Sequence, residues 1–489
     1  MIYIIGRVFI IKKKFILLLC AFLMLISAFT LTACNNAPQE VIISFVAYGE
    51  DAFKPITRNI GYTYGELPMP YPMPIRLNYG LSWWTAREGG ERVVSETIVS
   101  LTTNHTLYAR WTFLGTISQN QFLDSNRNRW ALGRNNVGQL GNGTTDNEVR
   151  YFPELIEKET QFSQISFGSS SLALDGYGNL FSWGNELVGQ NTWQARPAPI
   201  QIMPDKQFIS AAGGSFGIDM DGRFWSWGDN SRGRLGLAGI YRYSEFQGRY
   251  IYWPDGRRYL LSPIQIMQDN TFVQVAAGTS HTLALDTNGR IWSWGLGTEG
   301  QLGVPIIMRH AYTVSNTTPQ QVISPLRFSR IFANRSNSFA IDTNGGLWGW
   351  GDNGVFNLNG ALLAGGWLGD GTTTTRARPV RIAQGTRFLH VSTSGRNTVA
   401  IDIHGRLWSW GVNVNGQVGD GYTTVRIGAI TSLNNDRLAP VHIIQDTLFS
   451  YACASGMAID IHGNFWGWGS IFSEINNSDF PKQFTLGEI

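Results

Sequence analysis

The chain has 489 residues, of which 43% are hydrophobic, 13% aromatic and 15% charged. This composition excludes an intrinsically disordered chain and leaves room for two or three domains. The formal net charge is +3, but residues 1–33 hold four basic and no acidic residues, so the remainder has 34 basic and 35 acidic residues. A nearly neutral chain offers no electrostatic basis for binding nucleic acid.

The first 34 residues have the order of a secretory signal. A basic segment at 12–14 precedes an almost purely apolar stretch at 15–29, and small residues precede Cys34 in the sequence LTAC. This order is typical of a signal peptide. The last four residues resemble the lipobox of bacterial lipoproteins, in which the cysteine is acylated and becomes the first residue of the mature protein. We therefore expect a signal peptide at 1–33, a lipidated Cys34 and a linker at 34–40.

An uncleaved membrane helix is the alternative, because the stretch 15–33 is nearly long enough to span a bilayer. Both interpretations place the rest of the chain outside the cytoplasm and hold it at a membrane. Cys20 lies in the apolar stretch and Cys34 would carry lipid, which leaves Cys453 in the folded part. The sequence therefore predicts neither a disulfide framework nor a cysteine metal site.

Residues 41–112 form a separate segment without the repeats found later in the chain. It begins with the alternating stretch VIISFVAYG, continues through YGELP (64–68) and the paired Trp83 and Trp84, and ends in HTLYARW (105–111). These motifs resemble the Listeria–Bacteroides repeat, also called the internalin B-repeat, although the Pro-rich stretch 68–74 is longer than usual. The resemblance implies a small β-grasp module of a bacterial surface protein, acting as a spacer.

Seven related segments follow, each ending in a Trp-rich motif. A well-preserved copy reads HTLALDTNGRIWSWG, from His281 to Gly295, and in every copy an Asp precedes the terminal Gly at the same spacing. The terminal glycines are Gly133, Gly184, Gly228, Gly295, Gly351, Gly411 and Gly469. The steps between them are unequal: the shortest leads from Gly184 to Gly228 and the longest from Gly228 to Gly295. Fixed spacing within the unit and variable spacing between units indicate one structural element joined by variable loops.

Each repeat contains four short apolar segments. The last two are joined by Asp-x-x-Gly, a hairpin signal, because Asp suits the start of a type I turn and Gly accepts the left-handed conformation three residues later. Arg127 replaces this glycine in the first repeat. Four strands repeated seven times predict an all-β, seven-bladed β-propeller over residues 113–489. A parallel β-solenoid would need shorter repeats, and helical repeats would need a helical period that is absent.

The ends of the repeat region suggest how the ring closes. The first repeat has no Pro-led strand before it, and FPKQF (480–484) is a spare strand at the C-terminus. We expect this last strand to complete the first blade, so that no strand edge is left open at the junction.

The combined pattern LALDxxGxLWSWGxNxxGQLGxG resembles the regulator of chromosome condensation repeat family, which forms seven-bladed propellers. The resemblance covers about three quarters of the chain and is fullest around GQLG (300–303) and GQVGDG (416–421). The family often has a His five positions before the Asp, and here His281 alone fills that place. The family's eukaryotic prototype is a guanine-nucleotide exchange factor for a small GTPase.

Two short motifs have the spelling of chemical sites. Gly295, Gly297 and Gly300 spell G-x-G-x-x-G, but Pro305 argues against the helix that a dinucleotide-binding loop requires. Residues 213–217 spell G-x-S-x-G, but a hairpin pattern follows where a nucleophile elbow needs a helix. We interpret both as repeat loops, and expect no catalytic residue and no cofactor.

The seven turn aspartates also invite a metal-binding interpretation. Each belongs to a different blade and is explained by its own turn, whereas a calcium site needs several oxygens converging at one point. No zinc-spaced Cys/His cluster and no phosphate-binding G-K-[ST] loop occur in the sequence. We therefore expect no metal site.

The longest step between repeats contains an unusual segment from Tyr241 to Tyr259. It includes five Tyr, one Trp and four Arg, the residue types that dominate binding hot spots. A PDG turn signal at 254–256 predicts a projecting hairpin. The candidate partner-binding residues are Tyr241, Tyr243, Arg249, Tyr250, Tyr252, Trp253, Arg257, Arg258 and Tyr259. The alternative is a decorated hairpin that packs against its neighbours.

The function expected from the sequence is binding without catalysis. The propeller loops of an exported, lipid-anchored protein would engage an extracytoplasmic protein or glycan, and the segment 41–112 would hold the ring off the membrane. Guanine-nucleotide exchange is the alternative that the family resemblance implies, although an export signal argues against a cytosolic GTPase partner. An unrecognised cell-surface hydrolase is the second alternative.

Overall fold

The computed structural model divides the chain into two compact units, Met1–Thr112 and Phe113–Ile489. The residues that the structure describes are 40–47, 50–59, 79–84, 92–93, 104–113, 116–118, 121–124, 127–157, 161–166, 170–185, 189, 194–237, 240–244, 249–253, 259–304, 315–356, 362–422, 426–427, 430–431, 435–461, 463–469 and 480–484.

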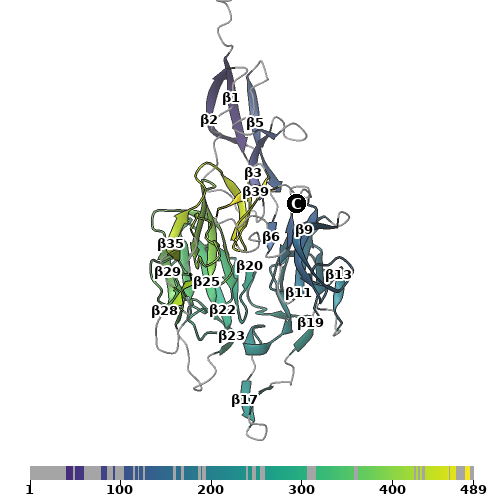
Figure 1. The fold of residues 1–489 in the computed structure, drawn as a ribbon. Helices are drawn as coiled ribbons and strands as arrows, with labels where there is room; N and C mark the ends of the chain where they lie inside the picture. The colour runs from purple at the N-terminus through teal and green to yellow at the C-terminus, as the bar shows by residue number, and fades with distance from the viewer. Residues whose placement is uncertain are drawn as a thin grey trace, which may run out of the picture. The chain divides into compact units, whose positions relative to one another are not determined.

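The first unit contains one five-stranded sheet (Figure 1). Its strands are β1 (Glu40–Ala47), β2 (Glu50–Asn59), β3 (Tyr79–Trp84), β4 (Arg92–Val93) and β5 (His105–Phe113), in the order β2-β1-β5-β3-β4. β1 pairs antiparallel with β2 and parallel with β5. Val41, Ile43 and Leu107 are buried, so the alternating apolar residues of β1 supply part of the core of this sheet.

The described part of the second unit contains seven four-stranded antiparallel sheets, which are numbered here in chain order. Sheet 1 consists of β6 (Thr116–Ser118), β7 (Gln121–Leu123), β8 (Arg129–Asn135) and β9 (Asp146–Glu157); sheet 2 of β10 (Phe162–Ser166), β11 (Ser170–Asp175), β12 (Leu180–Gly184) and β13 (Arg196–Ile202); sheet 3 of β14 (Phe208–Ala212), β15 (Phe216–Asp219), β16 (Phe224–Asp229) and β19 (Tyr259–Ile266). A single 3₁₀ turn, η1 (Ser231–Gly233), follows β16.

The remaining sheets follow the same plan. Sheet 4 consists of β20 (Phe272–Ala277), β21 (His281–Asp286), β22 (Ile291–Leu296) and β23 (Ser315–Gln321); sheet 5 of β24 (Phe328–Asn334), β25 (Asn337–Asp342), β26 (Leu347–Gly351) and β29 (Arg376–Ile382); sheet 6 of β30 (Phe388–Thr393), β31 (Asn397–Asp402), β32 (Leu407–Gly411) and β35 (Arg437–His442); sheet 7 of β36 (Phe449–Cys453), β37 (Met457–Asp460), β38 (Phe465–Gly467) and β39 (Lys482–Phe484).

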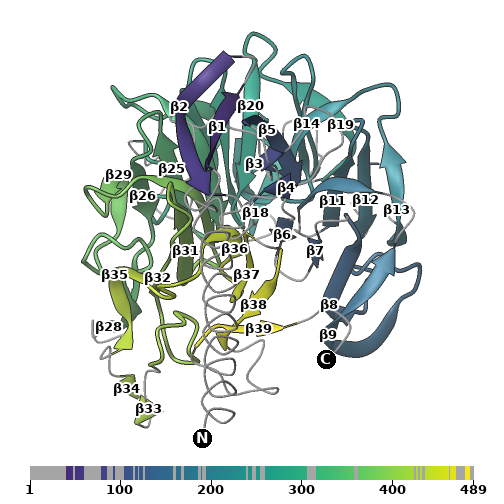
Figure 2. The ribbon, with the colours of Figure 1, turned by 90° about the horizontal axis from the view of Figure 1, so that it is seen from above.

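The sheets are arranged around a common centre, as Figure 2 shows. The first strand of each sheet is innermost and packs against the first strands of both neighbours, including β36 of sheet 7 against β6 of sheet 1. The second strands of sheets 4, 5 and 6 are buried at every position because a neighbouring sheet covers each of their faces. The all-β, propeller-like fold expected from the repeats is confirmed.

The expected mode of ring closure is wrong. β39, which lies within FPKQF, pairs with β38 and completes sheet 7 rather than sheet 1. The fourth strand of sheet 1 is β9, which follows β8 in the chain. The Pro-led segment is thus the last strand of each repeat, not the first, and every sheet is built from one continuous stretch of chain.

Candidate partner-binding surface

The turn between the second and third strands is held by its aspartate. In sheet 4 the Asp286 carboxylate accepts hydrogen bonds through Oδ1 from the backbone N–H of Asn288 (2.9 Å) and of Arg290 (2.8 Å), and through Oδ2 from the indole Nε1 of Trp292 (3.2 Å). The same indole-to-carboxylate bond joins Trp130 to Asp124, Trp225 to Asp219, Trp348 to Asp342, Trp408 to Asp402 and Trp466 to Asp460. Each of these carboxylates therefore acts within its own turn.

The second Trp of the motif joins neighbouring sheets. Trp294 in β22 is fully buried, and its Nε1 donates to the backbone carbonyl of Arg234 in the preceding sheet at 2.8 Å. Four other junctions repeat this bond, from Trp183 to Gln139, from Trp350 to Gln301, from Trp410 to Trp367 and from Trp468 to Gln417. In all five cases the acceptor is the second residue of a G-x-[LV]-G loop. The two tryptophans thus have different tasks, within a sheet and between sheets.

The two motifs with chemical spellings are repeat loops, as interpreted. Gly300 and Gly303 belong to the G-x-L-G loop that receives Trp350, and a Cβ at Gly303 would lie 2.9 Å from its Nε1. Ser215 is 2% exposed in the turn that joins β14 to β15, with strands on both sides. Neither segment has the following helix that phosphate binding or a nucleophile elbow requires.

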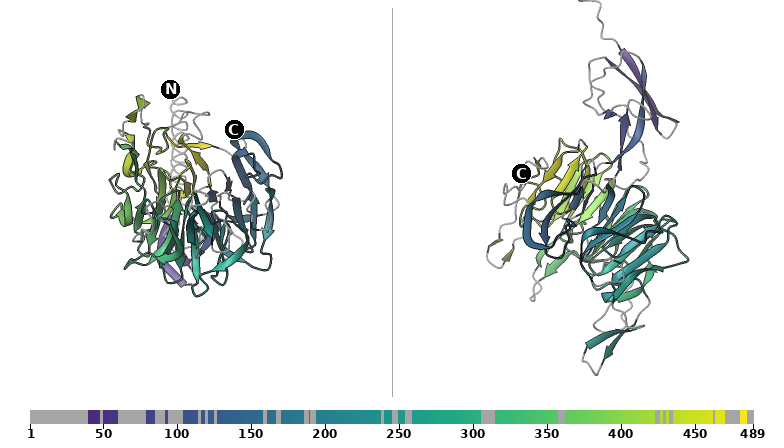
Figure 3. Two further views of the ribbon diagram at one scale, coloured as in Figure 1. Left: turned by 90° about the horizontal axis from the view of Figure 1, so that it is seen from below. Right: turned by 90° about the vertical axis from the view of Figure 1, so that its right-hand side faces the viewer.

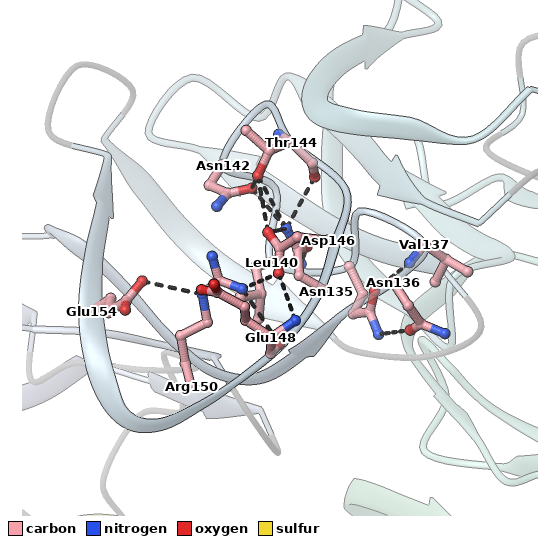
Figure 4. Close-up of polar contacts among 11 residues, drawn as sticks. Asn135, Asn136, Val137, Leu140, Asn142, Thr144, Asp146, Glu148, Arg150 and Glu154 are labelled. Atoms are coloured by element: carbon pink, nitrogen blue, oxygen red, sulfur yellow. Dashed lines mark hydrogen bonds and ion pairs between the residues drawn. The ribbon is translucent and has the colours of Figure 1, made fainter.

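An asparagine organises the connection between the third and fourth strands (Figure 4). Asn135 Nδ2 donates to Asn142 Oδ1 (3.0 Å) and to the carbonyl of Thr144 (3.0 Å), while its Oδ1 accepts the N–H of Leu140 (3.1 Å). Asp146 closes the loop by pairing with Arg150, and this hydrogen bond lowers the pKa of the Asp146 carboxyl to about 2.

The same arrangement recurs in sheets 5 and 6. There the asparagine donates to a carboxylate that also pairs with an arginine: Asn353 with Asp370 and Arg376, and Asn413 with Asp420 and Arg437. These connections therefore leave the ring from a base that is fixed by side-chain hydrogen bonds.

Three of these connections carry an additional two-stranded sheet. The added pairs are β17 (Ile240–Ser244) with β18 (Arg249–Trp253), β27 (Gly354–Phe356) with β28 (Leu362–Gly365), and β33 (Arg426–Ile427) with β34 (Ile430–Thr431). Each lies between the third and fourth strands of its sheet. Because all strands in a sheet are antiparallel, these connections leave from one end of the ring and the Asp turns lie at the other. Figures 1 and 3 show β17 beyond the ends of the four-stranded sheets.

The hairpin expected between Tyr241 and Tyr259 is present as the antiparallel pair β17–β18. Its register places Tyr241 opposite Tyr252 and Tyr243 opposite Tyr250. Directly opposed residues and their i+2 neighbours share one face of a ribbon, so these four tyrosines lie on one face. The other face holds Ile240 opposite Trp253, Arg242 opposite Ile251 and Ser244 opposite Arg249.

The other candidate residues lie elsewhere. Tyr259 begins β19 and pairs with Asp229 in β16, so it belongs to sheet 3 and not to the added ribbon. Arg257, Arg258 and Cys34 lie outside the described residues.

His281 is a connector between sheets. Its side chain is fully buried and its Nε2 lies 2.8 Å from Ser338 Oγ in the next sheet. Burial lowers the pKa of His281 to about 4, so the ring is neutral at pH 7. Neither its accessibility nor its protonation state suits acid–base chemistry on a ligand.

A set of polar residues on the innermost strands was not predicted from the sequence. The third residue of these strands bonds the backbone of the next sheet: Gln274 both donates to the carbonyl and accepts from the N–H of Ile331, each at 2.9 Å, and His390 Nε2 lies 2.9 Å from the carbonyl oxygen of Ala452. Gln164 and Arg330 bond the backbone in the same way. The common signal is a polar residue two positions after the Phe of each repeat, but its chemical type varies.

The described residues include no group of three or more His, Cys, Asp or Glu arranged to hold a metal ion. In the same part of the chain, no helix has the length and apolar character needed to cross a membrane. The geometry is therefore that of a rigid ring with loops added at one end.

Comparison with known sequences identifies the repeat. The regulator of chromosome condensation (RCC1) repeat matches residues 130–174, 221–285 and 288–341, and a second model of the same repeat matches residues 272–301. The chain carries RCC1 repeats. These matches begin and end within the Trp-rich segments that the sequence pattern singled out.

Human Protein RCC2 is 32% identical over 250 residues, a match that covers 45% of this chain and 46% of that protein. The chain thus spans about half the length of this relative. The Ultraviolet-B receptor UVR8 of Arabidopsis thaliana is 26% identical over 321 residues, which cover 62% of this chain and 64% of the receptor.

A solved structure supports the fold of the RCC1-repeat unit. Prp20p from Saccharomyces cerevisiae superposes with a TM-score of 0.58 at 19% sequence identity, covering 76% of this chain and 87% of that chain. At this identity the likeness establishes the propeller-like fold and nothing finer.

Proposed function

We propose that the RCC1-repeat ring is a non-catalytic protein-binding scaffold whose partner contacts the end of the ring that carries β17–β18, β27–β28 and β33–β34; this end is called the insertion end below. One observation carries the proposal: all three added ribbons interrupt the same connection, between the third and fourth strands, in sheets 3, 5 and 6. Binding residues are concentrated on loops that a rigid scaffold positions.

The residue types of the longest ribbon support a protein partner. Tyr, Trp and Arg dominate hot spots in protein interfaces because they bury a large area and lose little conformational freedom. The solved structure of Prp20p is described with its binding properties to Gsp1p and histones, so a protein of this fold has protein partners. The proposal takes from it only the class of partner. A glycan partner is the alternative.

The site of action is proposed to be outside the cytoplasm. The LTAC motif and the apolar stretch before it support lipidation of Cys34 and anchoring at a membrane, with the first unit as a spacer. Replacing Cys34 with Ala should abolish labelling by a radioactive or alkyne-tagged fatty acid and release the protein from the membrane fraction. Labelling that persists in the variant would exclude this anchor.

The binding proposal is tested by replacing residues 240–258 with a short Gly/Ser link. The four-stranded sheets should remain, since loop length contributes little to the free energy of unfolding, whereas capture of the partner by cross-linking on intact cells should be lost. Tyr177→Ala is the matched control, because Tyr177 is an aromatic residue 80% exposed in the Asp turn at the opposite end. Equal capture by the link variant and the native chain would contradict the proposal.

Guanine-nucleotide exchange is distinguished by the same variants. An exchange factor would accelerate release of a fluorescent nucleotide from a small GTPase, whereas the proposed scaffold leaves the release rate unchanged. Capture that is lost after enzymatic removal of glycans from the cell surface would instead favour the glycan alternative.

A further inference from the structure

The junction between sheets 7 and 1 differs from the other six in its covalent connection. At six junctions the chain runs directly from the fourth strand of one sheet to the first strand of the next. Sheet 7 ends the strand order with β39 and sheet 1 begins the ring with β6, so among the described strands no direct polypeptide link and no shared strand crosses this junction, which we call the closing seam.

The closing seam also lacks the tryptophan bond between sheets. In sheets 2 to 7 the second Trp of the motif is fully buried, and where its acceptor is described it donates to a loop of the preceding sheet. In sheet 1 this position is occupied by Leu132. Leucine has no side-chain donor, so it cannot form the bond that joins the internal junctions.

Side-chain packing holds the closing seam. Phe122 and Leu132 of sheet 1 pack with Cys453, Met457, Ile459 and Phe465 of sheet 7, and the ring centroids of Phe122 and Phe465 are 5.0 Å apart. Within the described residues this cluster has 6 buried members, whereas the cluster between sheets 4 and 5 has 11, including Trp350. The internal junction therefore excludes more apolar surface from water.

From these three differences we infer that the ring opens reversibly at the closing seam while the other six junctions stay intact. An opening of this kind breaks one apolar interface and no covalent or strand connection, so it costs less free energy than global unfolding. It would expose Cys453, which is 5% exposed in the closed ring. Sheets 3, 5 and 6, which carry the added ribbons, keep their four strands and their ribbons when the seam opens.

Cys453 reports the opening directly. In the full chain with Cys20 and Cys34 replaced by Ser it is the single thiol, because the sequence contains three cysteines. The rate of its reaction with a thiol reagent under native conditions measures how often the seam opens. The matched control carries Ala276→Cys and Cys453→Ala in the same background, since Ala276 is 8% exposed and lies four positions after the Phe of its strand, as Cys453 does.

We expect Cys453 to react at least ~10-fold faster than the thiol at position 276, with a weaker dependence on denaturant. Equal rates with equal denaturant dependence would overturn the inference. If Ala276→Cys prevents folding, amide hydrogen exchange of the native chain gives the same information. β7 and β37 should then exchange faster than β21 and β25, and uniform exchange across these four strands would contradict an opening at the seam.

Discussion

The two ends of the ring are built under different constraints. At one end the connections between second and third strands are short, and they repeat the same Asp-to-Trp bond. At the insertion end every connection between third and fourth strands is longer, and the longest, from β16 to β19, includes a ribbon of its own. The comparison teaches that a propeller separates its tasks along each strand: one end fixes the hairpin, and the other supplies variable surface above a hydrogen-bonded base.

The largest effect on stability is expected at the Asp-turn end. Asp286→Ala removes the acceptor of two backbone N–H groups and leaves the indole N–H of Trp292 without its partner. We expect the free energy of unfolding to fall by about 3 kcal/mol, because hydrogen bonds to a charged acceptor are stronger than neutral ones. Chemical denaturation measures the loss. Asp286→Asn keeps one acceptor oxygen and should lose less, and partner binding should be unchanged in both variants.

An effect of similar size is expected from pH at the junctions between sheets. Burial lowers the pKa of both His281 and His390 to about 4, below the unfolded value near 6.5. The unfolded chain therefore binds protons first, and stability should fall as the pH decreases from 6.5 towards 4, by roughly 3 kcal/mol for each histidine.

The control for this pH dependence is His281→Gln, which retains a donor for Ser338 Oγ. The unfolding free energy of this variant should decline less steeply between pH 6.5 and 4 than that of the native chain. Identical slopes would show that His281 is not the group that titrates.

At the insertion end the expected effects concern binding and leave stability unchanged. Tyr250→Ala and Trp253→Ala should each weaken partner binding by about 2 kcal/mol, the size of a typical hot spot. Since the two residues lie on opposite faces of the β17–β18 ribbon, the larger loss identifies the face that the partner contacts. Titration of the purified partner measures both affinities, and unchanged affinity in both variants would remove the ribbon from the interface.

The smallest effect concerns the turn that departs from the repeat. Arg127 has φ 64° at the position where other repeats have glycine, such as Gly289 with φ 73°. A non-glycine residue in the left-handed region is strained, so Arg127→Gly should raise the free energy of unfolding by about 1 kcal/mol. A decrease in the midpoint of thermal unfolding would mean that contacts of the arginine side chain outweigh the strain.

The repeat unit was largely predictable because its spacing is strict. The Asp, the turn glycine and the two tryptophans identified a hairpin, and four apolar segments identified a four-stranded blade. The Pro-led segment was assigned to the wrong end of the repeat, since a repeating pattern does not by itself define where its unit begins. That single shift of phase turned FPKQF from the last strand of sheet 7 into an expected strand of sheet 1.

The candidate surface was predicted in part. The aromatic segment and its hairpin were visible as composition and as a turn signal, whereas the ribbons at β27–β28 and β33–β34 are short and lack such signals. The register that gathers four tyrosines on one face could not be derived, because the loop between the two ribbon strands does not specify the pairing.

The sequence by itself determined the local structure, because turn chemistry and strand alternation act between residues that are close in the chain. Partners that are distant in the chain were decided only by the tertiary structure. Trp294 bonds the carbonyl of Arg234 and His281 contacts Ser338 because neighbouring sheets are pressed face to face around the ring. The physical reason is that burial leaves these polar groups no water to bond, so each must take the acceptor or donor that the adjacent sheet presents.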